Sequence, residues 1–178
     1  MEPKIYLDYT QKELDDQYEH RSIVPDSDKF IARNEADSAK IRADADGQFD
    51  VAYGSHPDQL LDIFPAKGDD PSPIVVFFHG GRWSRGDKTN NIESLVGYNA
   101  AGVHFISVGF TLIPNIDMDG LVGQCRDAIA WVWRNAKSFG GDPDRLFVVG
   151  KSSGGHLGGM MVVTDWVAER DVPGDVIK

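Results

Sequence analysis

A serine flanked by glycines is the residue of this chain best suited to covalent chemistry. The stretch VVGKSSGGHL (148–157) places Gly150, Ser152 and Gly154 in a Gly-x-Ser-x-Gly pattern directly after apolar residues. Such a pattern is typical of a sharp strand-to-helix turn that exposes a nucleophilic hydroxyl, with the glycines relieving crowding. The backbone N–H of Ser153, at the start of the helix, could donate to an oxyanion. The alternative is a serine that only caps a glycine-rich helix.

A second glycine-rich segment could supply the other oxyanion donors. HGGRW (79–83) follows the apolar run IVVFF (74–78), and its two glycines let the backbone approach a substrate closely. The alternative is an ordinary Gly-Gly turn. We interpret His79 as an organiser of this loop, because the base that serves a serine on such a turn comes after it in the chain. His156, four residues after Ser152, is expected to back the turn rather than face the substrate.

The other histidines do not suggest a metal site. His20 and His56 are expected at the surface, and His104 opens a predicted strand. None has neighbours with the spacing of metal ligands, so we assign no metal.

Composition narrows the function classes. The 178 residues include 28 acidic and 18 basic side chains, a net charge of −10, and no Lys/Arg cluster, which argues against a nucleic-acid partner. We interpret the acidity as a solubility feature. No apolar run approaches the length of a membrane span, and the N-terminus lacks the layout of a signal peptide. The single cysteine, Cys125, fits a reducing compartment, so we expect a cytoplasmic globular protein without a membrane or nucleic-acid partner.

The elements that must position these residues alternate between strands and helices. IVVFF is typical of a strand buried on both faces, and the alternation predicts a mostly parallel, doubly wound sheet with helices on both sides. Residues 1–47 are polar and helical, and 48–178 form the core. The expected strands are 48–54, 59–66, 74–78, 104–110 and 145–150, and the expected helices are 11–20, 27–43, 90–101 and 119–138.

Taken together, the motifs resemble the α/β-hydrolase fold, and within it the kynurenine formamidase (arylformamidase)-like and hormone-sensitive-lipase-like serine hydrolases. The resemblance implies a cofactor-free hydrolase of amide or ester carbonyls, with Ser152 as nucleophile and residues 1–47 as a cap over the site. It implies oxyanion donors at Gly80, Gly81, Arg82 and Ser153. The matching segments are HGGRW (79–83), FTLIP (110–114), GGDPDR (140–145), GKSSGGHL (150–157) and TDW (164–166).

Two departures from the family pattern bear on the substrate. Arg82 stands where the family commonly has tyrosine, and Lys151 stands where it commonly has histidine or an acid. With Trp83, Lys151 is expected to line the substrate pocket. Two cations near the serine favour a small substrate that carries a carboxylate, unless both side chains point to solvent or to the protein's own carboxylates. The bond cleaved could be a formamide-type amide, or the ester or carbamate of a carboxylesterase.

The triad Asp and His are not expected within this chain. By resemblance they would follow strands beyond Lys178, and no histidine follows the acidic residues 165–175. The segment 145–150 would also be left as a bare apolar sheet edge, which folded proteins avoid. We therefore expect the fold to be completed by the remaining C-terminal part of the same hydrolase, as a second polypeptide. Self-association and an inactive fragment or binding module without its base remain alternatives.

Overall fold

The computed structural model describes residues 2–19, 23–68 and 71–178, which form two units, Met1–Asp37 and Ser38–Lys178. The first unit contains the antiparallel pair β1 (Lys4–Tyr6) and β2 (Tyr9–Thr10), helix α1 (Gln11–Tyr18) and the beginning of α3 (Ser27–Asp44). Thr10 and Glu13 cap α1 reciprocally, through Glu13 N to Thr10 Oγ1 (3.2 Å) and Thr10 N to Glu13 Oε2 (2.8 Å). The helix predicted over 11–20 ends at Tyr18. His20 lies outside the described residues.

The second unit is built on one mixed sheet with the strand order β3-β4-β6-β5-β7. β5 runs parallel to both β6 and β7, whereas β4 runs antiparallel to β3 and β6. β7 lies at the edge beside β5, as the sequence predicted, and no other strand of the described residues pairs with its outer side. The strands are β3 (Gln48–Ala52), β4 (Leu60–Phe64), β5 (Ser72–Phe78), β6 (His104–Val108) and β7 (Gly141–Gly150).

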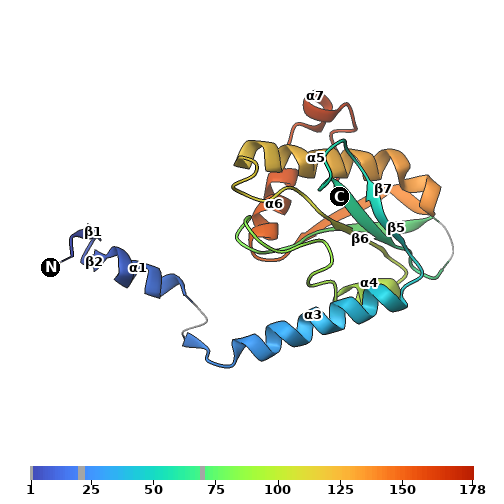
Figure 1. Cartoon of the computed structure of the whole chain (residues 1–178). Helices are drawn as coiled ribbons and strands as arrows, with labels where there is room; N and C mark the ends of the chain where they lie inside the picture. The colour runs from blue at the N-terminus through green and yellow to red at the C-terminus, as the bar shows by residue number, and fades with distance from the viewer. Residues whose placement is uncertain (1, 20–22, 69–70) are drawn as a thin grey trace. The chain divides into compact units, whose positions relative to one another are not determined.

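Helices cover both faces of this sheet (Figure 1). On one face lie α5 (Met118–Asn135), α6 (Ser153–Val162) and α7 (Trp166–Arg170); on the other lie α4 (Leu95–Ala100) and the end of α3. Side chains of β5 alternate between the two hydrophobic cores: Ile74, Val76 and Phe78 belong to the first, and Val75 and Phe77 to the second. β5 is thus buried on both faces, which confirms the prediction from its apolar run.

The helix predicted over 119–138 is α5, and it buries one apolar face. Leu121, Cys125, Ala128, Ile129 and Val132 are all buried. The helix begins at the N-cap Asp117, which accepts from Gly120 N at 2.8 Å, and is followed by a short 3-10 helix (Ala136–Phe139). No helix among the described residues is both long and apolar enough to cross a bilayer.

Two elements differ most from the sequence prediction in where they begin. β7 begins at Gly141 rather than 145, because Gly141 already pairs with Ser72. The helix predicted over 90–101 is only α4, since polar side chains hold the preceding residues in turns: Asp87 Oδ1 accepts from Thr89 N and Asn90 Oδ1 from Asp87 N, both at 2.9 Å. This segment therefore continues the loop that follows β5.

Candidate active site

Ser152 lies at a sharp turn between β7 and α6. Its backbone is left-handed, with φ 53° and ψ −120°, a conformation that costs a non-glycine residue about 1–3 kcal/mol. Two backbone hydrogen bonds hold the turn, from Lys151 N to Phe78 O (3.2 Å) and from Gly154 N to Lys151 O (2.8 Å). Ser152 is exposed, and its side chain makes no capping hydrogen bond to α6. The capping alternative is therefore wrong, and the hydroxyl is presented outward.

The two glycines around Ser152 are required by close backbone contacts. A methyl group at Gly150 would lie 2.1 Å from Gly154 O, and one at Gly154 would lie 2.0 Å from Phe78 O. Both distances are far below contact distance, so neither position accepts a side chain without moving the turn. The Gly-x-Ser-x-Gly pattern thus has a steric cause.

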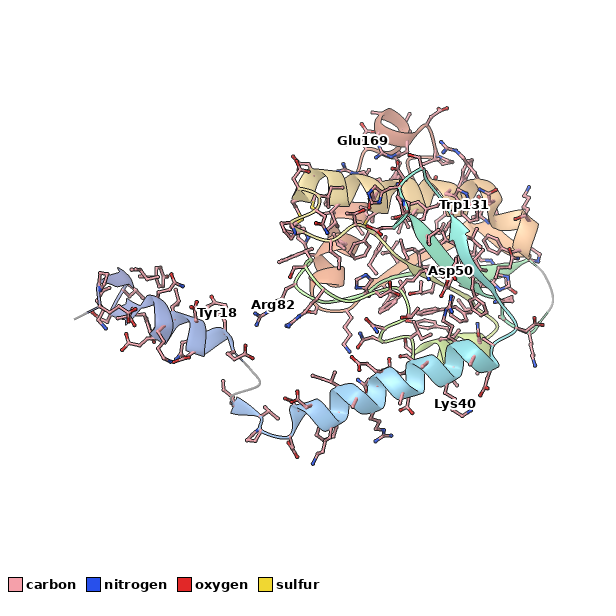
Figure 2. The ribbon with its side chains drawn as sticks, in the orientation of Figure 1. Tyr18, Lys40, Asp50, Arg82, Trp131 and Glu169 are labelled. Atoms are coloured by element: carbon pink, nitrogen blue, oxygen red, sulfur yellow. The ribbon has the colours of Figure 1, made fainter. Side chains whose placement is uncertain are left out.

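Residues 79–88, here called the Gly-Gly loop, pass directly beside Ser152. A methyl group at Gly80 would lie 3.2 Å from Ser152 Cβ and 2.9 Å from Lys151 O. The loop turns sharply next, because Gly81, Arg82 and Trp83 all have positive φ values (130°, 54° and 59°) and Gly81 O accepts from the N–H groups of residues 84 and 85 at 3.1 Å. The Arg82 side chain extends outward from this edge of the core (Figure 2).

The Ser153 hydroxyl joins the two motifs. Ser153 is buried, and its Oγ accepts from Trp83 N at 3.4 Å. The sequence suggested only a role for its backbone N–H, so this tether is a feature that motif reasoning missed. The Trp83 ring packs against the main core and meets the exposed His156 edge-to-face at 5.5 Å. His156 therefore lies against the Gly-Gly loop.

Lys151, immediately before the nucleophile candidate, points to the segment that follows the Gly-Gly loop. Its Nζ donates to Asn91 Oδ1, and the side chain is exposed. Asn91 has a positive φ of 60°, which aims this segment back toward β7. The hydrogen-bond acceptor for Lys151 is thus an amide oxygen, and no sequence motif marked Asn91 in advance.

His79 organises the loop it begins. Its ring is buried and stacks on Phe110 with 4.4 Å between centroids, and its Nδ1 lies 2.8 Å from Gly80 O. Burial lowers the pKa of His79. Across residues 2–19, 23–68 and 71–178, no histidine is hydrogen-bonded to the Ser152 hydroxyl: His56 is exposed beside Thr111, and His104 is buried at the start of β6.

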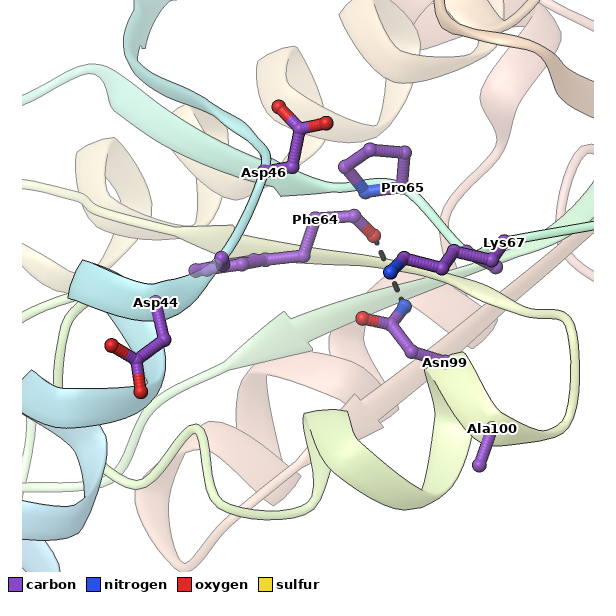
Figure 3. A pocket seen from close by; sticks show the side chains of 9 residues that line it. Asp44, Asp46, Phe64, Pro65, Lys67, Asn99 and Ala100 are labelled. Carbon is purple, nitrogen blue, oxygen red and sulfur yellow. Dashed lines mark hydrogen bonds between the residues drawn. The ribbon is translucent and has the colours of Figure 1, made fainter.

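Two pockets lie at opposite ends of the strands of this sheet. One, of about 380 Å³, lies beside the Gly-Gly loop and is lined in part by His79, Lys88, Phe110 and Leu112. A larger one, of about 590 Å³, lies at the other end, where Asn99 Nδ2 donates to Phe64 O at 3.2 Å (Figure 3). The first borders the Gly-Gly loop, but neither pocket is lined by Ser152, Lys151 or Trp83. The described residues contain no group of three or more His, Cys, Asp or Glu placed to hold a metal.

Comparisons with known proteins show what this chain is similar to. The BD-FAE family model matches residues 61–173. Kynurenine formamidase of Danio rerio is 32% identical over 118 residues, 66% of this chain and 39% of that protein. Esterase LipC of Mycobacterium tuberculosis (strain ATCC 25618 / H37Rv) is 32% identical over 117 residues, 64% of this chain and 29% of that protein. The chain thus spans well under half the length of these two relatives.

Among solved structures, one with a similar fold is the crystal structure of a candidate thioesterase from Silicibacter sp. tm1040. It superimposes with a TM-score of 0.73 and 26% sequence identity, over 84% of this chain and 55% of that chain.

Proposed function

The chain belongs to the BD-FAE family and its core has an α/β-hydrolase fold, and from this we propose that it supplies the nucleophile and the oxyanion donors of a serine hydrolase for ester or amide bonds. The observation that carries the proposal is the strained, exposed turn at Ser152 with Gly80 packed against it. The named relatives, a formamidase and an esterase, hydrolyse bonds of these two kinds.

In the proposed mechanism the Ser152 hydroxyl attacks the substrate carbonyl while a histidine base takes its proton. Backbone N–H groups of Gly80, Gly81, Arg82 and Ser153 would stabilise the oxyanion. Collapse of the tetrahedral intermediate expels the alcohol or amine, which receives the proton, and leaves an acyl-enzyme on Ser152. Water, deprotonated by the same base, then releases the acid and regenerates the serine. No cofactor takes part in these steps.

We propose that the base and its acid partner come from the remaining C-terminal part of the same hydrolase, bound as a second polypeptide. The outer side of β7 supports this, because a sheet edge without a partner strand is a site for further pairing. β7 and the helical segments after it also carry exposed apolar side chains, as expected if part of this surface is covered. These side chains are Phe147, Val162, Val163 and Val167.

The proposed substrate is small and carries a carboxylate. Lys151 immediately precedes the nucleophile in the sequence and Arg82 belongs to the Gly-Gly loop that passes beside it, and both are exposed cations. The bond is a formamide-type amide in the first proposal. An ester or carbamate is the second candidate, which the likeness to an esterase supports.

Labelling with a fluorophosphonate tests the nucleophile. In the complete assembly we expect Ser152 to be labelled, Ser152→Ala to abolish labelling and lower turnover roughly 10⁴-fold or more, and the exposed control Ser94→Ala to behave as wild type. If Ser152 stays unlabelled there, the chain is a binding module rather than part of an enzyme. Assays of a formyl-anilide against short acyl esters then separate the two substrate candidates.

A further inference from the structure

A buried ion cluster lies behind the Gly-Gly loop. Asp62, on β4, is fully buried, and its carboxylate accepts from Arg42 Nε at 2.7 Å and from Asp50 N at 2.9 Å. Lys88 Nζ lies 3.1 Å from the same carboxylate and 2.6 Å from Asp50 Oδ1. Arg42 Nη2 completes the cluster at 3.1 Å from Asp50. A carboxylate this deeply buried is tolerated only with such partners.

Lys88 connects this cluster to the end of the Gly-Gly loop. Its side chain is only 7% exposed, and its backbone carbonyl accepts from Ser107 Oγ at 2.5 Å, so the residue is held at both ends. Two residues earlier, the loop folds back on its own beginning, because a methyl group at Gly86 would lie 2.6 Å from Gly80 O and 2.8 Å from His79 Nδ1. Gly86 thus links the Lys88 end of the loop to Gly80.

The energetics of the buried ion cluster favour a role in positioning the Gly-Gly loop rather than in stabilising the fold. Two carboxylates balance two cations, but desolvation makes a buried ion cluster a weak source of stability compared with apolar packing. The Gly-Gly loop, in contrast, has three successive residues with positive φ, and such a backbone persists only where its surroundings hold it. Lys88 ties the end of that loop to Asp50 on β3 and to Asp62 on β4.

We propose that Lys88 is a positioning residue: through Asp62 and Asp50 it holds the Gly-Gly loop so that the backbone N–H groups beside Ser152 meet the oxyanion. The inference rests on the proposed function. Oxyanion donors act on the transition state more than on the bound substrate, so loosening them lowers kcat and leaves KM nearly unchanged.

Arg42 offers a matched control, because it contacts the same two carboxylates but lies on α3, outside the loop. In the complete hydrolase we expect Lys88→Met to lower kcat by about 10- to 100-fold with KM within about twofold, less than the roughly 10²- to 10³-fold loss when an oxyanion donor is removed outright. Lys88→Arg should restore most of kcat. Arg42→Met should stay within about threefold of wild type. Asp50→Asn, which keeps Lys88, provides a milder variant with an intermediate kcat.

Hydrogen exchange of residues 79–88 gives a readout that does not need turnover. We expect faster exchange in Lys88→Met than in Arg42→Met. Three results would overturn the positioning role of Lys88. They are an equal loss of kcat in Lys88→Met and Arg42→Met, a change confined to KM, and equal hydrogen exchange of residues 79–88 in the two variants. If wild type turns over no substrate, the proposed function fails, and the exchange comparison still decides whether Lys88 holds the loop.

Discussion

Replacing Gly154 with alanine tests the packing that presents Ser152. The new methyl group would lie 2.0 Å from Phe78 O and 2.7 Å from His79 O, whereas ordinary contact begins at 3.4 Å. Both obstructing atoms belong to the backbone, so no side chain can rotate away. The first turn of α6 must therefore move away from the end of β5 by more than about 1 Å.

Two opposing effects determine how much Gly154→Ala changes the free energy of unfolding. Overpacking costs about 1–3 kcal/mol, and the rigid backbone places this case near 3 kcal/mol. Alanine in place of helical glycine returns up to about 1 kcal/mol, which leaves a net loss of about 2 kcal/mol in the free energy of unfolding. Gly159→Ala is the matched control in the same helix, because it is exposed with no atom within 4 Å of its new methyl group, and it should gain about 0.5–1 kcal/mol.

Urea unfolding of the purified variants measures the change in the free energy of unfolding. Fluorophosphonate labelling in the complete assembly measures how well Ser152 is presented. Since a shift of about 1 Å at a reacting group costs about 100-fold in rate, we expect labelling of Gly154→Ala to slow by that factor, with Gly159→Ala unchanged. Equal stability of the two variants would refute the contact between α6 and the end of β5.

Three further predictions concern single side chains. Ile106→Ala, in the fully buried centre of the sheet, should lower the free energy of unfolding by about 2–5 kcal/mol in urea titrations. Burial holds the pKa of His79 below its usual 6.5, so as the pH falls the unfolded chain binds a proton at His79 before the folded chain does. The free energy of unfolding should therefore decline from about pH 7 toward pH 5. His79→Gln should reduce this pH dependence of the urea midpoint. Ser153→Ala removes the acceptor for Trp83 N but keeps its own N–H, and should cost about 1 kcal/mol by the same measurement with a several-fold slower labelling rate.

The parts of the site that sequence alone predicted are those with local causes. The Ser152 turn depends on glycines two residues on either side, and HGGRW follows a strand whose apolar run marks it as buried. The predicted helix 90–101 was too long because the Asp87–Asn90 hydrogen bonds and the positive φ of Asn91 compete with helix formation, and propensity over a window does not register them. The division into a cap (1–47) and a core (48–178) stays a prediction.

The parts that sequence reasoning missed depend on partners distant in the chain. Lys88 meets Asp50 across 38 positions, and Ser153 meets Trp83 across 70. Nothing in the sequence around a lysine in a polar loop predicts that its side chain is buried. One signal was present, however: Asp62 is a single acid inside the apolar strand LLDIF, and a buried carboxylate requires cationic partners from elsewhere. That rule points to the existence of a cluster without identifying its members.

The two halves of the candidate site, the Ser152 turn and the Gly-Gly loop, are held by different parts of the structure. Substitutions can therefore affect one half without the other. Phe78 and Gly150 are paired in the parallel β5–β7 ladder, so the Gly-Gly loop and the Ser152 turn leave the sheet side by side. A slip of one residue in this pairing would exchange the faces of every β7 side chain, so the apolar cores on both faces enforce it. In our proposal, the inner conformation of the Gly-Gly loop depends instead on the contacts of Lys88 with Asp50 on β3 and Asp62 on β4. Core substitutions should therefore lower stability and labelling together, whereas a change at Lys88 should impair turnover in a protein that still folds and still presents Ser152.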